Sequence, residues 1–184
     1  DLTQRVQEHY NPIIRKIRNI EKPVVAAVNG VAAGAGASIA LCCDIVVACE
    51  SATFIQAFSK IGLIPDSGGT FFLPRLVGMQ KAAALMMTAE PVSAKDAEAM
   101  GMIYKVFSDE SFKKESWKLA SKLAKMPTKG LGLTKRLLNA SYSNNLEQQL
   151  DMEDKCQTIA GNTADFKEGI EAFFEKRKTN FKGE

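Results

Sequence analysis

The feature that most restricts the fold of this chain is an apolar segment that runs through a turn of glycine and alanine into further apolar segments. The run VVAAV at 24–28 has no polar interruption, which is typical of a strand buried on both faces. After the turn NGVAAGAG, the residues ASIALCCD at 37–44 predict a buried helix, and IVVAC at 45–49 predicts a second β-branched strand. Buried parallel strands that alternate with helices define an α/β fold.

Other segments extend this pattern on both sides. Helical periodicity over 3–20 precedes the first strand, and Pro12 predicts a bend or restart within it. Farther along the chain we expect a short strand at ATFI (52–55), a short helix interrupted by Pro74, a helix over 79–90, a helix capped by Ser93 and Asp96 that ends near Gly101, and a last strand over 102–107.

From Asp109 onward the sequence shows only helical patterns, broken at MPTKG, SN and AGNT. The expected organisation is therefore an α/β portion, residues 1–108, followed by a helical region, residues 109–184.

Composition narrows the range of partners and compartments. A net charge of +3 over 184 residues, with no concentrated basic run, gives no indication of nucleic acid or an anionic membrane as a partner. No apolar stretch approaches the roughly 18–20 residues of a membrane span. The cysteines form no C-x-x-C pair, which favours reduced thiols, no metal site and a cytoplasmic location; they are Cys42, Cys43, Cys49 and Cys156. The chain starts without Met, so an organellar targeting segment upstream stays an open alternative.

The glycine-rich turn is the first candidate for chemistry. The first N–H groups of a helix have no partner within it, and small residues let a ligand approach them, so this turn could hold a phosphate or an oxyanion. A dinucleotide site is disfavoured, because the G-x-G-x-x-G pattern has Ile39 where its third glycine belongs. The alternative is tight packing of helix on strand without function, and spacing alone leaves both open.

The second candidate is the turn within KIGLIPDSGGTFFLPRLVG at 60–78, where Asp66 is surrounded by Pro, Ser and Gly. One interpretation is that Asp66 or Ser67 caps the helix that follows. The other is that Asp66 is an acid/base that removes a proton next to a carbonyl held at the glycine-rich turn. Whether the two turns meet in space does not follow from one sequence.

Several motifs, in order and with consistent spacing, resemble the crotonase (enoyl-CoA hydratase/isomerase) superfamily. They are KPVVAAVNGVAAGAGASIALCCDIVVACESATF, the Asp66 turn, SAKDAEAMGMIYKV and DFKEGIEAFFEKRKTNF. Within it, YNPIIRKI and GLGLTKRLLNASYSNNLEQQLDMEDKCQTIAG are most similar to the ring-epoxyphenylacetyl-CoA isomerases of aerobic phenylacetate breakdown. The resemblance implies a crotonase-type ββα spiral with a helical C-terminal region that forms trimers or dimers of trimers. It also implies that an N-terminal part of family members, with one of two oxyanion N–H groups, lies outside this sequence.

Matching the motifs residue by residue implies a catalytic pair. Ala35 matches the N–H donor to the thioester oxygen, and Asp66 matches the carboxylate of the isomerases. Ser38 and Phe58 stand where hydratases carry glutamates, so isomerisation of an enoyl-CoA or a ring-epoxyphenylacetyl-CoA is favoured over hydration. The substrate-binding positions implied are Gly34, Gly36, Ser38, Phe58, Leu63 and Gly69.

The resemblance further implies that coenzyme A enters as part of the substrate and that no separate cofactor is needed. Phe181 and Lys182 match positions near the nucleotide end of a bound CoA. An enoyl-CoA hydratase and a non-catalytic acyl-CoA-binding protein of the same fold are the alternative functions.

Overall fold

The computed structural model describes residues 2–184, which form two compact units. The first unit contains the described residues up to Arg18 together with Val24–Trp117, and the second contains Asn19–Pro23 and Lys118–Glu184. The division after Trp117 falls within a helix, so the expected domain boundary at residues 108 and 109 stays a prediction.

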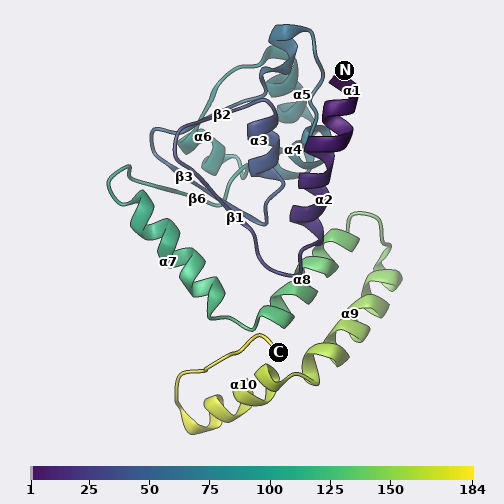
Figure 1. Ribbon diagram of the computed structural model, residues 1–184, viewed down its shortest axis with the longest axis vertical. Helices are drawn as coiled ribbons and strands as arrows, with labels where there is room; N and C mark the ends of the chain where they lie inside the picture. The colour runs from purple at the N-terminus through teal and green to yellow at the C-terminus, as the bar shows by residue number, and fades with distance from the viewer. Residues whose placement is uncertain (1) are drawn as a thin grey trace. The chain divides into compact units, whose positions relative to one another are not determined.

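One sheet of the first unit consists of the strands β1 (Val25–Val28), β3 (Ile45–Cys49) and β6 (Lys105–Phe107), in the order β1-β3-β6 (Figure 1). Both pairings are parallel, and Val25 lies opposite Ile45. The central strand β3 is almost wholly buried, whereas β1 lies at the edge and is half-buried. The prediction of burial on both faces is therefore confirmed for β3 and wrong for β1.

The second sheet consists of β2 (Val31–Ala33), β4 (Thr53–Ile55) and β5 (Val92–Ser93). β2 pairs with β4 in parallel, and β5 pairs with β4 antiparallel. The strand β2 lies where the sequence predicted only a turn. The backbone of these residues pairs with β4. This pairing fixes the end of β2, from which the chain passes directly into the next helix at Ala35.

The helical elements of the first unit begin at the N-terminus and then cover the sheets. They are α1 (Leu2–Arg5), the π-helical turn η1 (Val6–Tyr10), α2 (Asn11–Asn19, which ends in the second unit), α3 (Ala35–Leu41), the 3₁₀ turn η2 (Ala57–Ile61), α4 (Gly69–Val77), α5 (Met79–Thr88) and α6 (Ala94–Ala99). The restart at Pro12 is confirmed, since a π-helical turn directly precedes α2. The interruption at Pro74 is wrong, because α4 continues through it to Val77.

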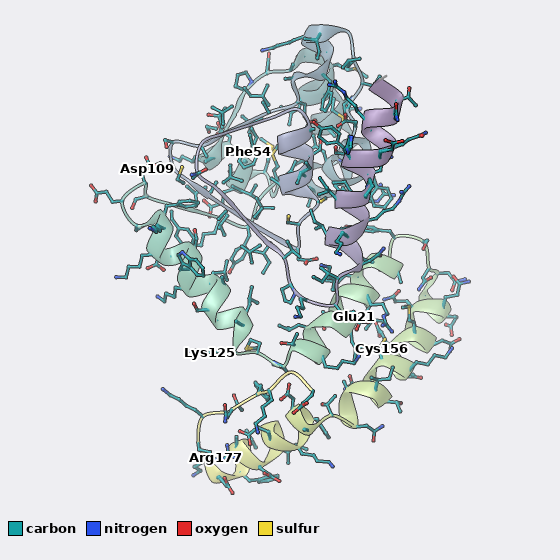
Figure 2. All side chains as sticks on the ribbon, in the orientation of Figure 1. Glu21, Phe54, Asp109, Lys125, Cys156 and Arg177 are labelled. Atoms are coloured by element: carbon teal, nitrogen blue, oxygen red, sulfur yellow. The ribbon has the colours of Figure 1, made fainter. Side chains whose placement is uncertain are left out.

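The core of the first unit lies between the sheets and these helices. Phe54 of β4 and Leu73 of α4 are among its buried apolar residues, and Phe54 is labelled in Figure 2. Helix α2 is attached through Arg18, whose guanidinium donates to the main-chain oxygen of Cys42 at 2.8 Å and to Oδ1 of Asp44 at 2.9 Å. Oδ2 of Asp44 accepts from the main-chain N–H of Val24 at 2.8 Å, so this carboxylate joins α2 to the region where β1 begins.

The second unit is helical, as predicted for the chain after Asp109. It contains the part of α7 (Phe112–Ala124) beyond Trp117, α8 (Thr128–Ala140), α9 (Leu146–Gly161) and α10 (Ala164–Glu175). Asn145 and Gln148 form a capping box at the start of α9, and Thr163 caps α10. Figure 2 labels Glu21, which forms ion pairs with Lys129 and Arg136 of α8.

Two carboxylates of α10 hold the C-terminal segment against that helix. The buried Asp165 accepts from the main-chain N–H groups of Lys182 (2.6 Å) and Gly183 (2.8 Å). Glu168 accepts two hydrogen bonds from Arg177, at 2.6 and 2.9 Å, and one from the Asn180 N–H at 2.7 Å.

Two further properties bear on the expectations from composition. Across residues 2–184, all four cysteines are free thiols. None of the helices in this described range has the length and apolar character needed to cross a membrane.

Candidate active site

The glycine-rich turn ends at Gly34, directly before the first residue of α3. Gly34, the residue before the helix, has φ +53° and ψ −124°, in a region that favours glycine. Its N–H donates to the Ile55 oxygen at 2.8 Å and so continues the ladder from β2 to β4. The next N–H, that of Ala35, belongs to the first turn of α3, where N–H groups have no acceptor within the helix.

The Asp66 turn is a tight reversal between η2 and α4. The Gly69 N–H donates to the Asp66 main-chain oxygen at 2.9 Å, and both central residues have positive φ, +52° at Ser67 and +76° at Gly68. These values are those of a type I′ turn. Glycine accepts this conformation freely, whereas for serine it costs about 1 kcal/mol.

The structure excludes one of the two interpretations of Asp66, because its side chain does not cap α4. The residue at the N-cap position of α4 is Gly68, and no side chain caps this helix. The Ser67 hydroxyl instead donates to Oδ1 of Asp66 at 3.0 Å. The capping hypothesis for Asp66 or Ser67 is therefore wrong.

Both turns contribute to one pocket of about 260 Å³ in the first unit. Asp66 is half-buried there, and Ala35 lies in the same wall. Among the described residues that line this pocket, Asp66 is the only carboxylate, and most of the others are apolar; the lining consists of Arg5, Val6, Tyr10, Gly34, Ala35, Ala57, Phe58, Ile61, Leu63 and Asp66. A carbonyl compound bound here would meet a single carboxylate in largely apolar surroundings.

The structure brings together five of the predicted site residues in this pocket, namely Gly34, Ala35, Phe58, Leu63 and Asp66. Gly36, Ser38 and Gly69 are not among the lining residues, and their contact with substrate stays a prediction. Ser38 and Gly69 are buried and lie against each other, since a Cβ added to Gly69 would lie 2.7 Å from Oγ of Ser38.

Sequence reasoning missed the contribution of the N-terminal helical segment. Arg5, Val6 and Tyr10 line the pocket, and the last two lie in the π-helical turn η1. π-Helical turns often occur at functional sites. The signal available in the sequence was Pro12, which disturbs the hydrogen bonds of the preceding turn, but it did not indicate which side chains would face a ligand.

The predicted CoA-contacting residues, Phe181 and Lys182, lie in the second unit. Phe181 packs on Gly169 and lines an apolar pocket of about 620 Å³, whereas Lys182 donates its main-chain N–H to Asp165. The remaining lining residues of this pocket are Pro127, Gly130, Ala160, Thr163, Asp165, Phe166, Ile170, Phe173 and Phe174. A contact of either residue with CoA stays a prediction.

Within residues 2–184, no group of three or more acidic, histidine or cysteine side chains is placed so that it could hold a metal ion.

The two turns bring a helix-start N–H and a carboxylate into one largely apolar pocket. The sequence profile of the family described as "Enoyl-CoA hydratase/isomerase" matches residues 2–184. The chain therefore belongs to the enoyl-CoA hydratase/isomerase family, and the resemblance inferred from the sequence is confirmed.

Relatives of this chain carry both activities in their names. The 1,2-epoxyphenylacetyl-CoA isomerase of Escherichia coli K12 is 48% identical over 183 residues, which are 100% of this chain and 70% of that protein. The 2,3-dehydroadipyl-CoA hydratase of the same organism is 35% identical over 183 residues, 100% of this chain and 72% of that protein.

Solved structures agree with the fold. An enoyl-CoA hydratase from Polaromonas sp. JS666 superimposes with a TM-score of 0.89 and 35% identity, over 98% of this chain and 74% of that one. An enoyl-CoA hydratase/isomerase from Cupriavidus metallidurans CH34 gives a TM-score of 0.92 and 33% identity, over 99% and 68%. The α/β class and the crotonase-type fold are thus confirmed.

Proposed function

We propose that this protein is an acyl-CoA isomerase in which Asp66 moves a proton between two carbons of the substrate. The observation that carries the proposal is the shared pocket of Asp66 and Ala35, in which Asp66 is the only carboxylate among the described lining residues. One base that removes a proton and returns it elsewhere is sufficient to shift a double bond.

The proposed reaction moves one proton and leaves the composition of the substrate unchanged. Asp66 removes a proton from the α-carbon of a 3-enoyl-CoA, and the electron pair of that C–H bond enters the thioester to form a dienolate. The Ala35 N–H donates to the enolate oxygen, where preorganised donors stabilise developing charge. The proton then passes from Asp66 to the γ-carbon, and the product is the conjugated 2-enoyl-CoA.

Hydration is the second candidate, and the names of several relatives favour it. Addition of water to a conjugated double bond needs activation of the water and delivery of a proton to carbon, which two carboxylates usually share. By the family resemblance those positions are Ser38 and Phe58 here, and Phe58 lines the pocket as an apolar wall. This supports isomerisation over hydration.

The substrate and the assembly are also part of the proposal. An enoyl-CoA and a ring-epoxyphenylacetyl-CoA are the two candidate substrates, the second because of the name of the E. coli relative. The trimer or dimer of trimers, and the contacts of Phe181 and Lys182 with CoA, follow from the family resemblance and stay predictions.

The test is Asp66→Asn, which keeps the shape of the side chain and removes the base. We expect conversion of a 3-enoyl-CoA, followed by the absorbance of the conjugated product, to fall by at least about 10²-fold. Exchange of α- and γ-protons in D₂O should fall in parallel, and binding of a saturated acyl-CoA should be unchanged. The matched control is Asp151→Asn, because Asp151 is exposed on α9.

Each other outcome has a defined meaning. Full isomerisation by Asp66→Asn would overturn the proposal. Faster hydration of a 2-enoyl-CoA than isomerisation by the unmodified protein would assign it to the hydratases. Acyl-CoA binding without either reaction would identify a non-catalytic member of the fold.

A further inference from the structure

Ser67 combines three properties that its place in the turn does not require. Its backbone has φ +52°, which glycine would adopt without strain, and glycine already occupies the next two positions. The residue is buried, with 1% of its surface exposed. Its hydroxyl donates to Oδ1 of Asp66 and caps no helix. The hydroxyl of this strained, buried serine therefore interacts with the carboxylate beside it and not with the helix.

The hydrogen bond distinguishes the two oxygens of Asp66. Oδ1 accepts from Ser67 at 3.0 Å, whereas Oδ2 has no hydrogen-bond partner among residues 2–184. A carboxylate held through one oxygen keeps a fixed side-chain rotamer, and its other oxygen is free to take up a proton. Asp66 itself lines the pocket that also contains Ala35.

We propose that Ser67 is a positioning residue, whose hydroxyl fixes the Asp66 carboxylate so that Oδ2 exchanges the proton with the substrate. This inference rests on the proposed isomerase function. Ser67 itself neither gains nor loses a proton during the reaction; it donates the same hydrogen bond to Oδ1 before and after Oδ2 is protonated. Its contribution is geometric, and a misplacement of about 1 Å at such a site costs up to about 10²-fold in rate.

A comparison of Ser67→Ala with Ser67→Gly separates the effect of losing the hydroxyl from the effect of backbone strain. Both variants lack the hydrogen bond, but only glycine relieves the strain at φ +52°, so the glycine variant should melt at a higher temperature than the alanine variant. We expect both to lower kcat for a 3-enoyl-CoA by about 10- to 100-fold. The dissociation constant of a saturated acyl-CoA should change by less than about twofold, because positioning acts on proton transfer and not on binding.

The control is Ser59→Ala, an exposed serine in η2 outside the pocket lining, which should leave kcat unchanged. Wild-type kcat in Ser67→Gly would overturn the inference, because it would mean that only the backbone conformation matters. Equal losses in kcat and in acyl-CoA binding would also overturn it, since they indicate a collapsed pocket. Asp66→Asn is measured beside these variants: if it retains activity, the proposed function fails; if it loses activity while Ser67→Gly does not, only the role of Ser67 fails.

Discussion

Ser38 of α3 and Gly69 at the start of α4 lie so close that a single methyl group would not fit between them. A Cβ placed on Gly69 would stand 2.7 Å from Oγ of Ser38 and 3.3 Å from Cβ of Pro65. Both residues are buried, so the Ser38 side chain cannot turn into solvent to make room. This contact sets the distance between the helix that begins at Ala35 and the turn that carries Asp66.

Gly69→Ala should lower the free energy of unfolding by about 1–3 kcal/mol, the usual cost of overpacking a close contact. The measurement is chemical denaturation of each variant, repeated in a Ser38→Ala background. Because Ser38 supplies the nearest atom, the cost of Gly69→Ala should be smaller there, and the difference is the coupling energy. Identical costs in both backgrounds would contradict the contact.

Ser38→Ala by itself should leave stability unchanged or raise it by about 1 kcal/mol. The Ser38 hydroxyl is fully buried and has no hydrogen-bond partner among residues 2–184, so it carries a desolvation cost that alanine would not. Alanine is also the better helix former. A clear loss in the denaturation midpoint would mean that this hydroxyl has a partner in solution.

Gly34→Ala and Gly36→Ala should have opposite effects on the melting temperature. Gly34 has φ +53°, a backbone conformation that is strained for alanine, so alanine should destabilise the protein by about 1 kcal/mol; the Phe58 ring, 3.7 Å from an added Cβ, would be at ordinary contact distance. Gly36 lies within α3 with nothing within 4 Å of an added Cβ, so alanine should stabilise the helix by up to about 1 kcal/mol. Activity should fall in Gly34→Ala because the Ala35 N–H would move. Equal melting temperatures would contradict the prediction.

The sequence predicted those elements whose side chains carry a strong pattern. The β-branched run of β3 was placed at its observed bounds, because such residues favour a buried strand. The strand β2 was missed, since its small residues resemble a turn and its pairing with β4 is not local. Pro74 was expected to break α4. It removes the hydrogen bond to the Thr70 oxygen and crowds that carbonyl, but Thr70 is exposed, so water can take the place of the lost donor.

The candidate site was predictable as two separate turns but not as one pocket. The glycine-rich turn and the Asp66 turn were each recognisable from local residue types. Their convergence depends on the parallel pairing of β2 with β4 and on the packing of α3 against α4, and neither is visible in one sequence. The question of capping likewise needed the φ angles of Ser67 and Gly68, which residue identity alone does not determine.

Asp44→Ala should lower the free energy of unfolding by about 2 kcal/mol. The carboxylate is only 16% exposed. Its removal deprives the Arg18 guanidinium and the Val24 N–H of this hydrogen-bond acceptor. The matched control is Glu21→Ala, which removes an exposed carboxylate paired with Arg136. Exposed ion pairs contribute little, so its melting temperature should stay close to wild type. A control that is as destabilised as Asp44→Ala would contradict this ranking.

The part of the attachment of the C-terminal segment to α10 that depends on Glu168 should be lost in acid. The hydrogen bonds from Arg177, with the Asn180 N–H as the second cause, lower the pKa of Glu168 from 4.5 to about 2. A group whose pKa is depressed on folding stabilises the fold above its unfolded pKa, and this contribution disappears as pH falls through the folded value. The NMR signal of the Asn180 amide should therefore be constant above about pH 5 and change toward pH 2. Glu168→Gln cannot ionise at this position and should remove the titration of the Asn180 amide. A titration midpoint near pH 4.5 in the unmodified protein would contradict the prediction, because it would show that Arg177 does not lower the pKa of Glu168.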